Sequence, residues 1–290
     1  MPSGPEPVER DSRGILDPWL LRQRVRLTRY PVGPALAGLV DRFWAVQWDL
    51  PEGTVHVQQV LTHPGANLSV GCPDAYSPGA ATGWVEARVH GVARGLTSRA
   101  LAGRGWAVAA MTTPGGLGPF VTGPAAALTD RVVPLGEALD VDEAALIARV
   151  TAAAGEAARV AVLAAEFEGA IDHERVAAAR RVAGVARTAE TDRSVQRLQQ
   201  LCDRSGIGPR ALQRLFLSEA GVSPTWVLRR YRLLDAAEAV RSGRRVPWAD
   251  ISADLGYADQ AHLSRDFRAA TGQTPSEYAR SQEASRAGDH

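Results

Sequence analysis

The chain has 290 residues, 45% of them apolar, and a formal net charge of +1, which fits two or three globular domains that bury their own cores. No uninterrupted apolar run reaches the ~18 residues of a membrane span, and the start "MPSGPEPVERDSRG" lacks the basic-then-apolar order of a secretory signal. The two cysteines, Cys72 and Cys202, are too few for a disulfide framework, so we expect a cytoplasmic protein with no membrane partner.

Strand-like runs dominate the first half of the chain. Residues 1–22 are rich in proline and charge, and we expect them to be disordered. From residue 23 to 137 short alternating runs are separated by Gly- and Pro-containing turns, which predicts a β-rich regulatory or dimerisation domain. The clearest run, "FWAVQWDL", puts Trp44, Val46 and Trp48 on one face. The other runs are "RVRLT", "TVHVQQVL", "WVEARVHGV" and "GWAVAAM".

Residues 138–190 contain no proline and are dense in Ala, Val, Glu and Arg, which predicts a helical connector. Its apolar faces could pack within the domain or a dimer, or bind a partner helix.

The last hundred residues contain a repeat. "LQRLFLSEAGVSP" begins at Leu212 and "LSRDFRAATGQTP" at Leu263, 51 residues later, with Leu, Arg, Phe, Gly, Ser/Thr and Pro at the same offsets. Such agreement predicts one supersecondary unit used twice. In each copy a short helix ends at a glycine, and the next helix starts at Pro209 or is capped by Asp259. This is the order of a helix-turn-helix, whose second helix fits the DNA major groove.

The second helix of each copy has a polar outer face. Leu212, Phe216, Leu263 and Phe267 form the buried faces, so the remaining positions point outward. Arginine pairs with guanine edges, glutamine with adenine edges, and other arginines with phosphates. The predicted base-facing residues are Arg210, Gln213, Arg214, Gln260, His262, Ser264 and Arg265, and the predicted phosphate contacts are Arg229, Arg230 and Arg268.

A long helix joins the two copies. It should run from Ser223–Pro224 to Ser242–Gly243, about 27 Å at 1.5 Å per residue, which compares with ~34 Å between successive major grooves. We therefore expect the recognition helices to sit over adjacent grooves. "TPSE" at Thr274 is a capping box for a last helix, in which Tyr278 packs inward.

Charge differs between the copies. From Ser194 to Arg245 ten arginines stand against four acidic residues, whereas from Val246 to His290 four arginines stand against seven. We expect the first motif to supply most of the attraction to phosphate.

The segment "ISADLGYADQAHLSRDFRAATGQTPSEYAR" resembles the C-terminal signature of AraC/XylS-type transcription regulators, through its Gly-aromatic pair, Ser-Arg-x-Phe-Arg core and Gly-x-Thr-Pro. It departs at Ser252, where Ala is usual, and at His262–Leu263, where an aromatic pair is common. The resemblance implies a monomeric DNA-binding domain with two motifs, over residues 191–282, followed by a disordered tail at 283–290. The N-terminal half resembles, more loosely, an uncharacterised β-rich domain that precedes such domains in some bacterial regulators.

The expected fold is α+β: a β-rich N-terminal domain, a helical connector, and an all-α domain of two helix-turn-helix motifs joined by a long helix. The expected function is sequence-specific transcription regulation without enzymatic activity, cofactor or metal. The expected partner is double-stranded DNA; RNA polymerase, a small-molecule effector and a second copy in a homodimer are further candidates. The alternative is a ligand sensor or enzyme in the N-terminal domain with a DNA-localising tail.

Other sites are weaker candidates. His56, His63 and His90 lack the H-x-H spacing of a metal site. "TTPGGLGPF" neither opens a helix nor ends in Lys-Ser/Thr, so we expect a flexible turn instead of a phosphate-binding loop. Some regulators with this C-terminus carry cysteine alkyl acceptors, but Cys72 has no basic companion in "VGCPDAY". Trp44, Trp48, Trp84 and Trp106 could line a pocket or fill the domain core.

Overall fold

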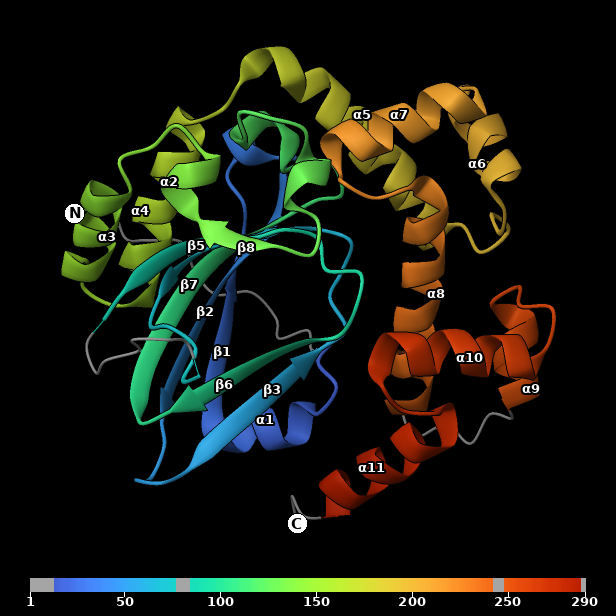
Figure 1. The fold of residues 1–290 in the computed structure, drawn as a ribbon, viewed down its shortest axis with the longest axis horizontal. Helices are drawn as coiled ribbons and strands as arrows, with labels where there is room; N and C mark the ends of the chain where they lie inside the picture. Colours follow the sequence, from blue (N-terminus) through green and yellow to red (C-terminus); the bar gives the residue numbers. More distant parts are fainter. Residues whose placement is uncertain (1–12, 77–83, 242–247, 288–290) are drawn as a thin grey trace.

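The structure, a computed structural model, describes residues 13–76, 84–241 and 248–287. A β-rich N-terminal half lies beside a helical C-terminal half, so the fold class is α+β as predicted (Figure 1). No helix in the described ranges is long and apolar enough to cross a membrane.

The N-terminal half is built on an antiparallel sheet of six strands in the order β1-β2-β7-β4-β5-β8 and a second sheet, β3-β6. All five predicted runs form strands. Strands β4, β6 and β8 were not predicted. In β4 the four residues from Leu68 to Gly71 are all buried, so this strand shows no alternation of apolar and polar residues. The strands are β1 Val25–Tyr30, β2 Val40–Asp49, β3 Val55–Val60, β4 Asn67–Gly71, β5 Glu86–His90, β6 Thr97–Ala102, β7 Arg104–Thr112 and β8 Val132–Pro134.

Both faces of the large sheet are covered, as the alternation in β2 requires. Phe43 and Ala45 lie on one face of β2 and pack in a core with the helices of this half. Trp48 and Val46 lie on the other face and pack in a smaller core with residues of β6 and helix α1 (Figure 1). The helices of this half are α1 Pro18–Arg24, α2 Leu135–Ala138, α3 Glu143–Ala152, α4 Glu156–Gly169 and α5 His173–Thr191, with short 3₁₀ turns at Pro34–Leu36, Gly118–Phe120 and Ala125–Leu128.

The predicted connector is part of the N-terminal domain. Leu146 in α3 and Leu163 and Phe167 in α4 are 0% exposed and share one core with Phe43. Helix α4 packs on β2 and β7, so these helices supply the apolar cover that one face of the sheet needs. Helix α5 also packs against the C-terminal half, because Val182 is buried in a core with residues of α6 to α8.

The predicted disorder of residues 1–22 is wrong for residues 13–22. Leu16 donates its amide hydrogen to Gln59 at 3.1 Å and so extends the β3 edge, and Asp17 caps α1 through the Leu20 amide at 2.9 Å. Leu16 and Leu21 are buried, which offsets the cost of ordering this segment. Residues 1–12 lie outside the described residues.

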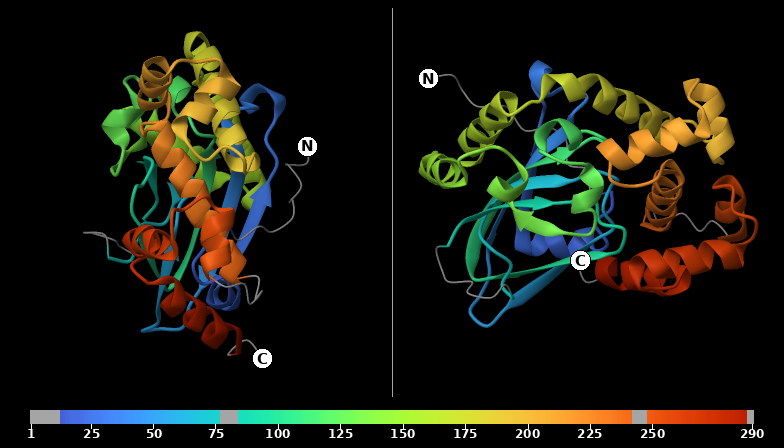
Figure 2. Two further views of the ribbon diagram at one scale, coloured as in Figure 1. Left: turned by 90° about the vertical axis from the view of Figure 1, so that its right-hand side faces the viewer. Right: turned by 45° about the horizontal axis from the view of Figure 1, so that its top comes forward.

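The C-terminal half is all-helical. Helix α8 forms a rod, with α6 and α7 at one end and α9 and α10 at the other (Figures 1 and 2). The predicted helix stop at Ser242–Gly243 and the end of the tail at 288–290 lie outside the described residues, but α11 continues past the predicted boundary at 282. The helices are α6 Leu198–Ser205, α7 Pro209–Glu219, α8 Pro224–Arg241, α9 Trp248–Asp254, α10 Gln260–Thr271 and α11 Pro275–Ala287.

Candidate nucleic-acid interface

The first motif consists of α6 and α7. Gly206 ends α6 in the left-handed region at φ 66°, and Pro209 occupies the first turn of α7, both as predicted. Leu212 and Phe216 are 0% exposed and pack in a core with Leu201 and Cys202. The opposite face of α7 is therefore free of the packing that holds the helix.

That outer face carries Arg210, Gln213 and Arg214, which are all exposed. Leu217 lies on the same face, one turn beyond Arg214, and is 40% exposed. Sequence reasoning missed Leu217 because leucine counted as a core residue. The 51-residue repeat contained the signal, since Leu217 is equivalent to Arg268, an exposed residue of α10.

The second motif repeats the geometry. Gly256 ends α9 at φ 70°, and Asp259 caps α10 by accepting a hydrogen bond from the His262 amide at 2.7 Å. Leu263 and Phe267 are 0% exposed. These features confirm the predicted turn and cap, so α9 and α10 form a second helix-turn-helix.

The predicted base-facing residues of α10 differ in exposure. Gln260 and Arg265 are exposed, whereas Ser264 and His262 are half-buried. The His262 ring meets the Tyr257 ring edge-on at 5.2 Å between centroids, and its Nε2 lies 3.9 Å from Asp266. Part of the His262 side chain is thus already engaged within the motif.

Helix α11 begins with the predicted capping box. The Thr274 amide donates to Glu277 at 2.7 Å, and the Glu277 amide donates to the Thr274 hydroxyl at 3.3 Å. The Glu277 carboxylate also accepts from the Thr274 hydroxyl at 2.8 Å, and the two hydrogen bonds that it accepts, first from the amide and then from the hydroxyl, lower its pKa. Tyr278 is 2% exposed, so it packs inward as predicted.

Helix α8 connects the motifs and presents adjacent arginines differently. Its 18 residues span about 27 Å. Arg229 is exposed, as is Arg268 in α10, so both remain available to phosphate. Arg230 is only 2% exposed.

The predicted phosphate contact of Arg230 is wrong. Its guanidinium donates to the Ala93 carbonyl at 3.3 Å and to the Arg94 carbonyl at 2.5 Å, and stacks 4.7 Å from the Trp226 ring. Burial lowers the pKa of Arg230 to about 10. The side chain therefore joins α8 to the N-terminal domain.

The end of α7 is also docked on the N-terminal domain. Glu219 is 5% exposed and pairs with Arg175 of α5 at 3.1 Å. The Thr129 hydroxyl donates to the Gly221 carbonyl at 2.7 Å. These contacts leave the outer face of α7 open while fixing its far end.

The turn "TTPGGLGPF" lies beneath this contact and is packed, not flexible. A Cβ on Gly116 would lie 1.8 Å from the Leu39 carbonyl oxygen, and one on Gly118 would lie 1.9 Å from Glu219 Oε2. The glycines permit close approach of backbone and side chain. The expectation of a flexible turn is therefore wrong.

The second motif is attached through the N-terminal segment. The Gln282 amide nitrogen donates to the Leu16 carbonyl at 2.7 Å, and the Tyr278 hydroxyl donates to the same oxygen at 3.4 Å. The Ser285 hydroxyl donates to Asp17 at 2.8 Å. Residues that seemed disordered from sequence thus contact α11.

The three histidines considered as metal ligands have different hydrogen-bond partners. His56 contacts Gln58 at 3.1 Å, His63 contacts the Arg13 carbonyl at 3.3 Å, and His90 contacts Ser69 at 3.2 Å. Within the described residues no three His, Cys, Asp or Glu side chains are grouped to hold a metal ion. Burial, then Arg99 and Arg88, lower the pKa of His90 to about 4, so its ring is neutral at pH 7.

The tryptophans do not share one pocket. Trp48 is 5% exposed and packs in the small core under β3-β6, whereas Trp84 is 58% exposed. Trp44 donates to Asn67 at 3.0 Å and lines a cavity of about 220 Å³ between the sheets, and the Arg159 guanidinium lies 3.8 Å from the Trp106 ring. Cys72 is a half-buried free thiol.

Comparison with known proteins covers both halves. A family described as "Helix-turn-helix domain" matches residues 201–281, and a "Domain of unknown function (DUF6597)" matches residues 28–134. Regulatory protein SoxS of Salmonella typhimurium and that of Escherichia coli K12 are each 40% identical over 75 residues, which is 26% of this chain and 69% of each relative.

The solved structures that are similar to this chain include those of a domain of AraT and of ToxT. The C-terminal domain of AraT, a response regulator from Geobacillus stearothermophilus, is 27% identical with a TM-score of 0.31, covering 33% of this chain and 84% of that one. ToxT from Vibrio cholerae is 10% identical with a TM-score of 0.41, covering 82% and 97%.

Residues 201–281, which the helix-turn-helix family matches, include the recognition helices of both motifs and the rod between them. The exposed polar faces of α7 and α10, their glycine turns and the capping box all lie within the matched residues. The chain therefore belongs to the AraC-type helix-turn-helix family of DNA-binding transcription regulators.

Proposed function

We propose that the chain regulates transcription by inserting α7 and α10 into adjacent major grooves of one operator. The observation that carries this proposal is the pair of equivalent helices at the two ends of α8, a rod of about 27 Å. Successive major grooves on one side of DNA are ~34 Å apart, and the helix ends and side chains make up the difference.

Base recognition is assigned to the outer faces of the two helices. Arg210, Gln213 and Arg214 would read the first groove, with guanine or adenine as the partners that suit these side chains. In the second groove the readers would be Gln260, His262, Ser264 and Arg265.

Arg229 and Arg268 would contact phosphate, and the first motif would supply more of this attraction. Neutralising Arg214 and Arg229 should therefore flatten the salt dependence of binding more than neutralising Arg265 and Arg268. Equal flattening by the two double variants would refute the asymmetry.

The N-terminal domain would control DNA binding through a small-molecule effector or a homodimer, with RNA polymerase as a further partner on cytoplasmic DNA. This part of the proposal is supported by the docking of both motifs and the rod on that domain. A change there would reach both recognition helices.

The test measures binding of the full chain to DNA from its own upstream region by fluorescence anisotropy, against scrambled DNA of the same composition. We expect preference for the upstream DNA, which Arg214→Ala and Arg265→Ala each reduce. Arg181→Ala, an exposed arginine on α5, is the matched control and should bind as wild type.

The groove spacing is tested on the identified operator. Inserting five base pairs between its two half-sites rotates one by about half a helical turn, so affinity should fall to that of a single motif. Unchanged affinity would contradict the proposal that the two helices occupy adjacent major grooves. Equal binding to upstream and scrambled DNA would contradict sequence-specific regulation itself. It would favour the alternative in which the C-terminal half only localises the chain on DNA.

A further inference from the structure

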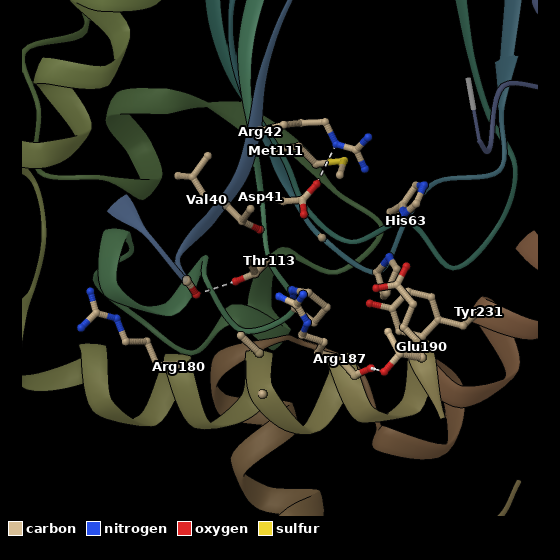
Figure 3. A pocket seen from close by; sticks show the side chains of 18 residues that line it. Val40, Asp41, Arg42, His63, Met111, Thr113, Arg180, Arg187, Glu190 and Tyr231 are labelled. Carbon is tan, nitrogen blue, oxygen red and sulfur yellow. Dashed lines mark hydrogen bonds and ion pairs between the residues drawn. The ribbon is translucent and has the colours of Figure 1, made fainter. Parts of the chain in front are cut away.

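A cavity of about 540 Å³ lies at the junction of the two halves (Figure 3). One wall is formed by the ends of β2 and β7 and the loop from His63 to Gly65. The other is a stripe on α5, and Tyr231 of α8 closes one end. The volume falls in the range of sites for small organic ligands.

The α5 wall is shaped by small residues between two arginines. Arg180, Ala183, Gly184 and Arg187 recur at helical spacing and all line the cavity. A Cβ on Gly184 would meet nothing within 4 Å, so packing does not require glycine there. Glycine inside a helix costs ~1 kcal/mol relative to alanine, so neither packing nor helix propensity explains a glycine at this position.

The cavity carries an excess of positive charge. Its two carboxylates already have guanidinium partners: Asp41 pairs with Arg42 at 2.7 Å, and Glu190 pairs with Arg13 at 2.6 Å. The Arg187 guanidinium, in contrast, makes no hydrogen bond or ion pair with any residue that the structure describes. Figure 3 shows it rising from α5 toward the opposite wall.

The wall opposite Arg187 has apolar positions beside its charged ones. Met111 and Pro114 are partly exposed there next to Asp41 and Arg42, and the Thr113 hydroxyl already donates to the Gly38 carbonyl at 2.8 Å. A ligand that suits both walls has an anionic group at one end and an apolar body at the other.

We propose that this cavity binds an organic oxyanion, a carboxylate or phosphate monoester on an apolar body, with its anionic oxygens on Arg187 and its body against Met111 and Pro114. The proposal deepens the small-molecule control included in the proposed function and rests on it for its regulatory consequence. Because Tyr231 belongs to the rod between the motifs, an occupied cavity adds contacts between that rod and the N-terminal sheet. Ligand and DNA binding are then linked.

The test is thermal unfolding of the full chain with phenylacetate, phenyl phosphate or the uncharged benzyl alcohol, each at ~10 mM. We expect at least one of the two anions to raise Tm, and which of them does so identifies the oxyanion. Benzyl alcohol should not raise Tm. Arg187→Gln should abolish the rise, while Arg181→Gln, on another face of α5, should keep it.

Gly184→Leu is the second variant, because it fills the cavity with Arg187 intact and suits a helix. It should weaken anion binding at least tenfold. No rise in Tm with either anion in the wild type, or the same rise in Arg187→Gln, would overturn the proposal. Binding of the full chain to upstream DNA without anion is measured in parallel. Failure of the anion to bind in the cavity is thereby distinguished from failure of the chain to bind its DNA specifically.

Discussion

Arg229 and Arg230 are adjacent in α8, yet the structure predicts opposite consequences when each is replaced by alanine. Arg230 is buried and contacts two carbonyls of the N-terminal domain, whereas Arg229 is exposed on the DNA-binding half. Arg230→Ala should therefore lower stability without changing the number of phosphate contacts. Arg229→Ala should remove one phosphate contact and leave the stability of the fold unchanged.

The magnitude for Arg230 follows from three contributions. Two hydrogen bonds from a charged donor stabilise by roughly 1.5–3 kcal/mol each. Holding the charge in its buried site costs about 3 kcal/mol, because its pKa falls from 12.5 to about 10. Truncation adds about 2 kcal/mol for the cavity that it leaves. The net loss of stability for Arg230→Ala is roughly 2–5 kcal/mol.

Two assays separate the arginines. In urea unfolding of the full chain, Arg230→Ala should shift the midpoint downward, while Arg229→Ala should stay within about 0.5 kcal/mol of wild type. In DNA binding, Arg229→Ala should reduce the slope of log affinity against log salt by ~0.9, and Arg230→Ala should leave it unchanged. A flattened slope with normal stability for Arg230→Ala would refute the reasoning.

Three further predictions concern single sites. Leu217 should contact a thymine methyl group, so replacing that thymine by uracil should weaken wild-type binding about fourfold, ~0.8 kcal/mol, and leave Leu217→Ala unaffected; a uracil scan with no sensitive position would contradict this. Because the folded pKa of His90 is about 4 and its ordinary value 6.5, the unfolded chain binds the proton first, and stability should fall by about 3 kcal/mol as pH drops from 6.5 to 4. In His90→Gln the urea midpoint should change much less between pH 6.5 and pH 4. The same pH dependence as in wild type would exclude His90 as the cause. Gly118→Ala should displace the Glu219 carboxylate and cost roughly 1–3 kcal/mol in the same assay, whereas Gly123→Ala, with nothing within 4 Å, should be neutral; equal midpoints would show that the turn is not tightly packed.

The DNA-binding half could be predicted in detail because its signals are local. A glycine after an apolar stripe, a proline at a helix start and an acidic cap each act within one turn of the chain. Gly206, Pro209, Asp259 and Thr274 therefore behave in the structure as their sequence positions indicate. The repeat then extended the prediction from one motif to two.

The docking of the halves could not be predicted, because it depends on pairs far apart in the chain. Buried residues occur on every side of α8, so helical periodicity does not distinguish Arg230 from Arg229. The partners of Arg230 lie 136 and 137 residues away. Similarly, proline and charge predicted disorder at the N-terminus, but Leu16 gains a β-strand neighbour and a helix partner that only the folded chain brings together.

The two motifs are held on the N-terminal domain by different kinds of contact. The first packs on α5, where Val182 and Ala186 are 0% exposed, and this apolar burial adds to the Glu219 ion pair. The second is attached through three hydrogen bonds to Leu16 and Asp17, about 3 kcal/mol in all. A ligand at a hundred times its Kd supplies a similar ~2.7 kcal/mol. The second motif should therefore detach first, and amides of α11 should exchange hydrogen faster than those of α7; equal protection would show that both motifs are held equally.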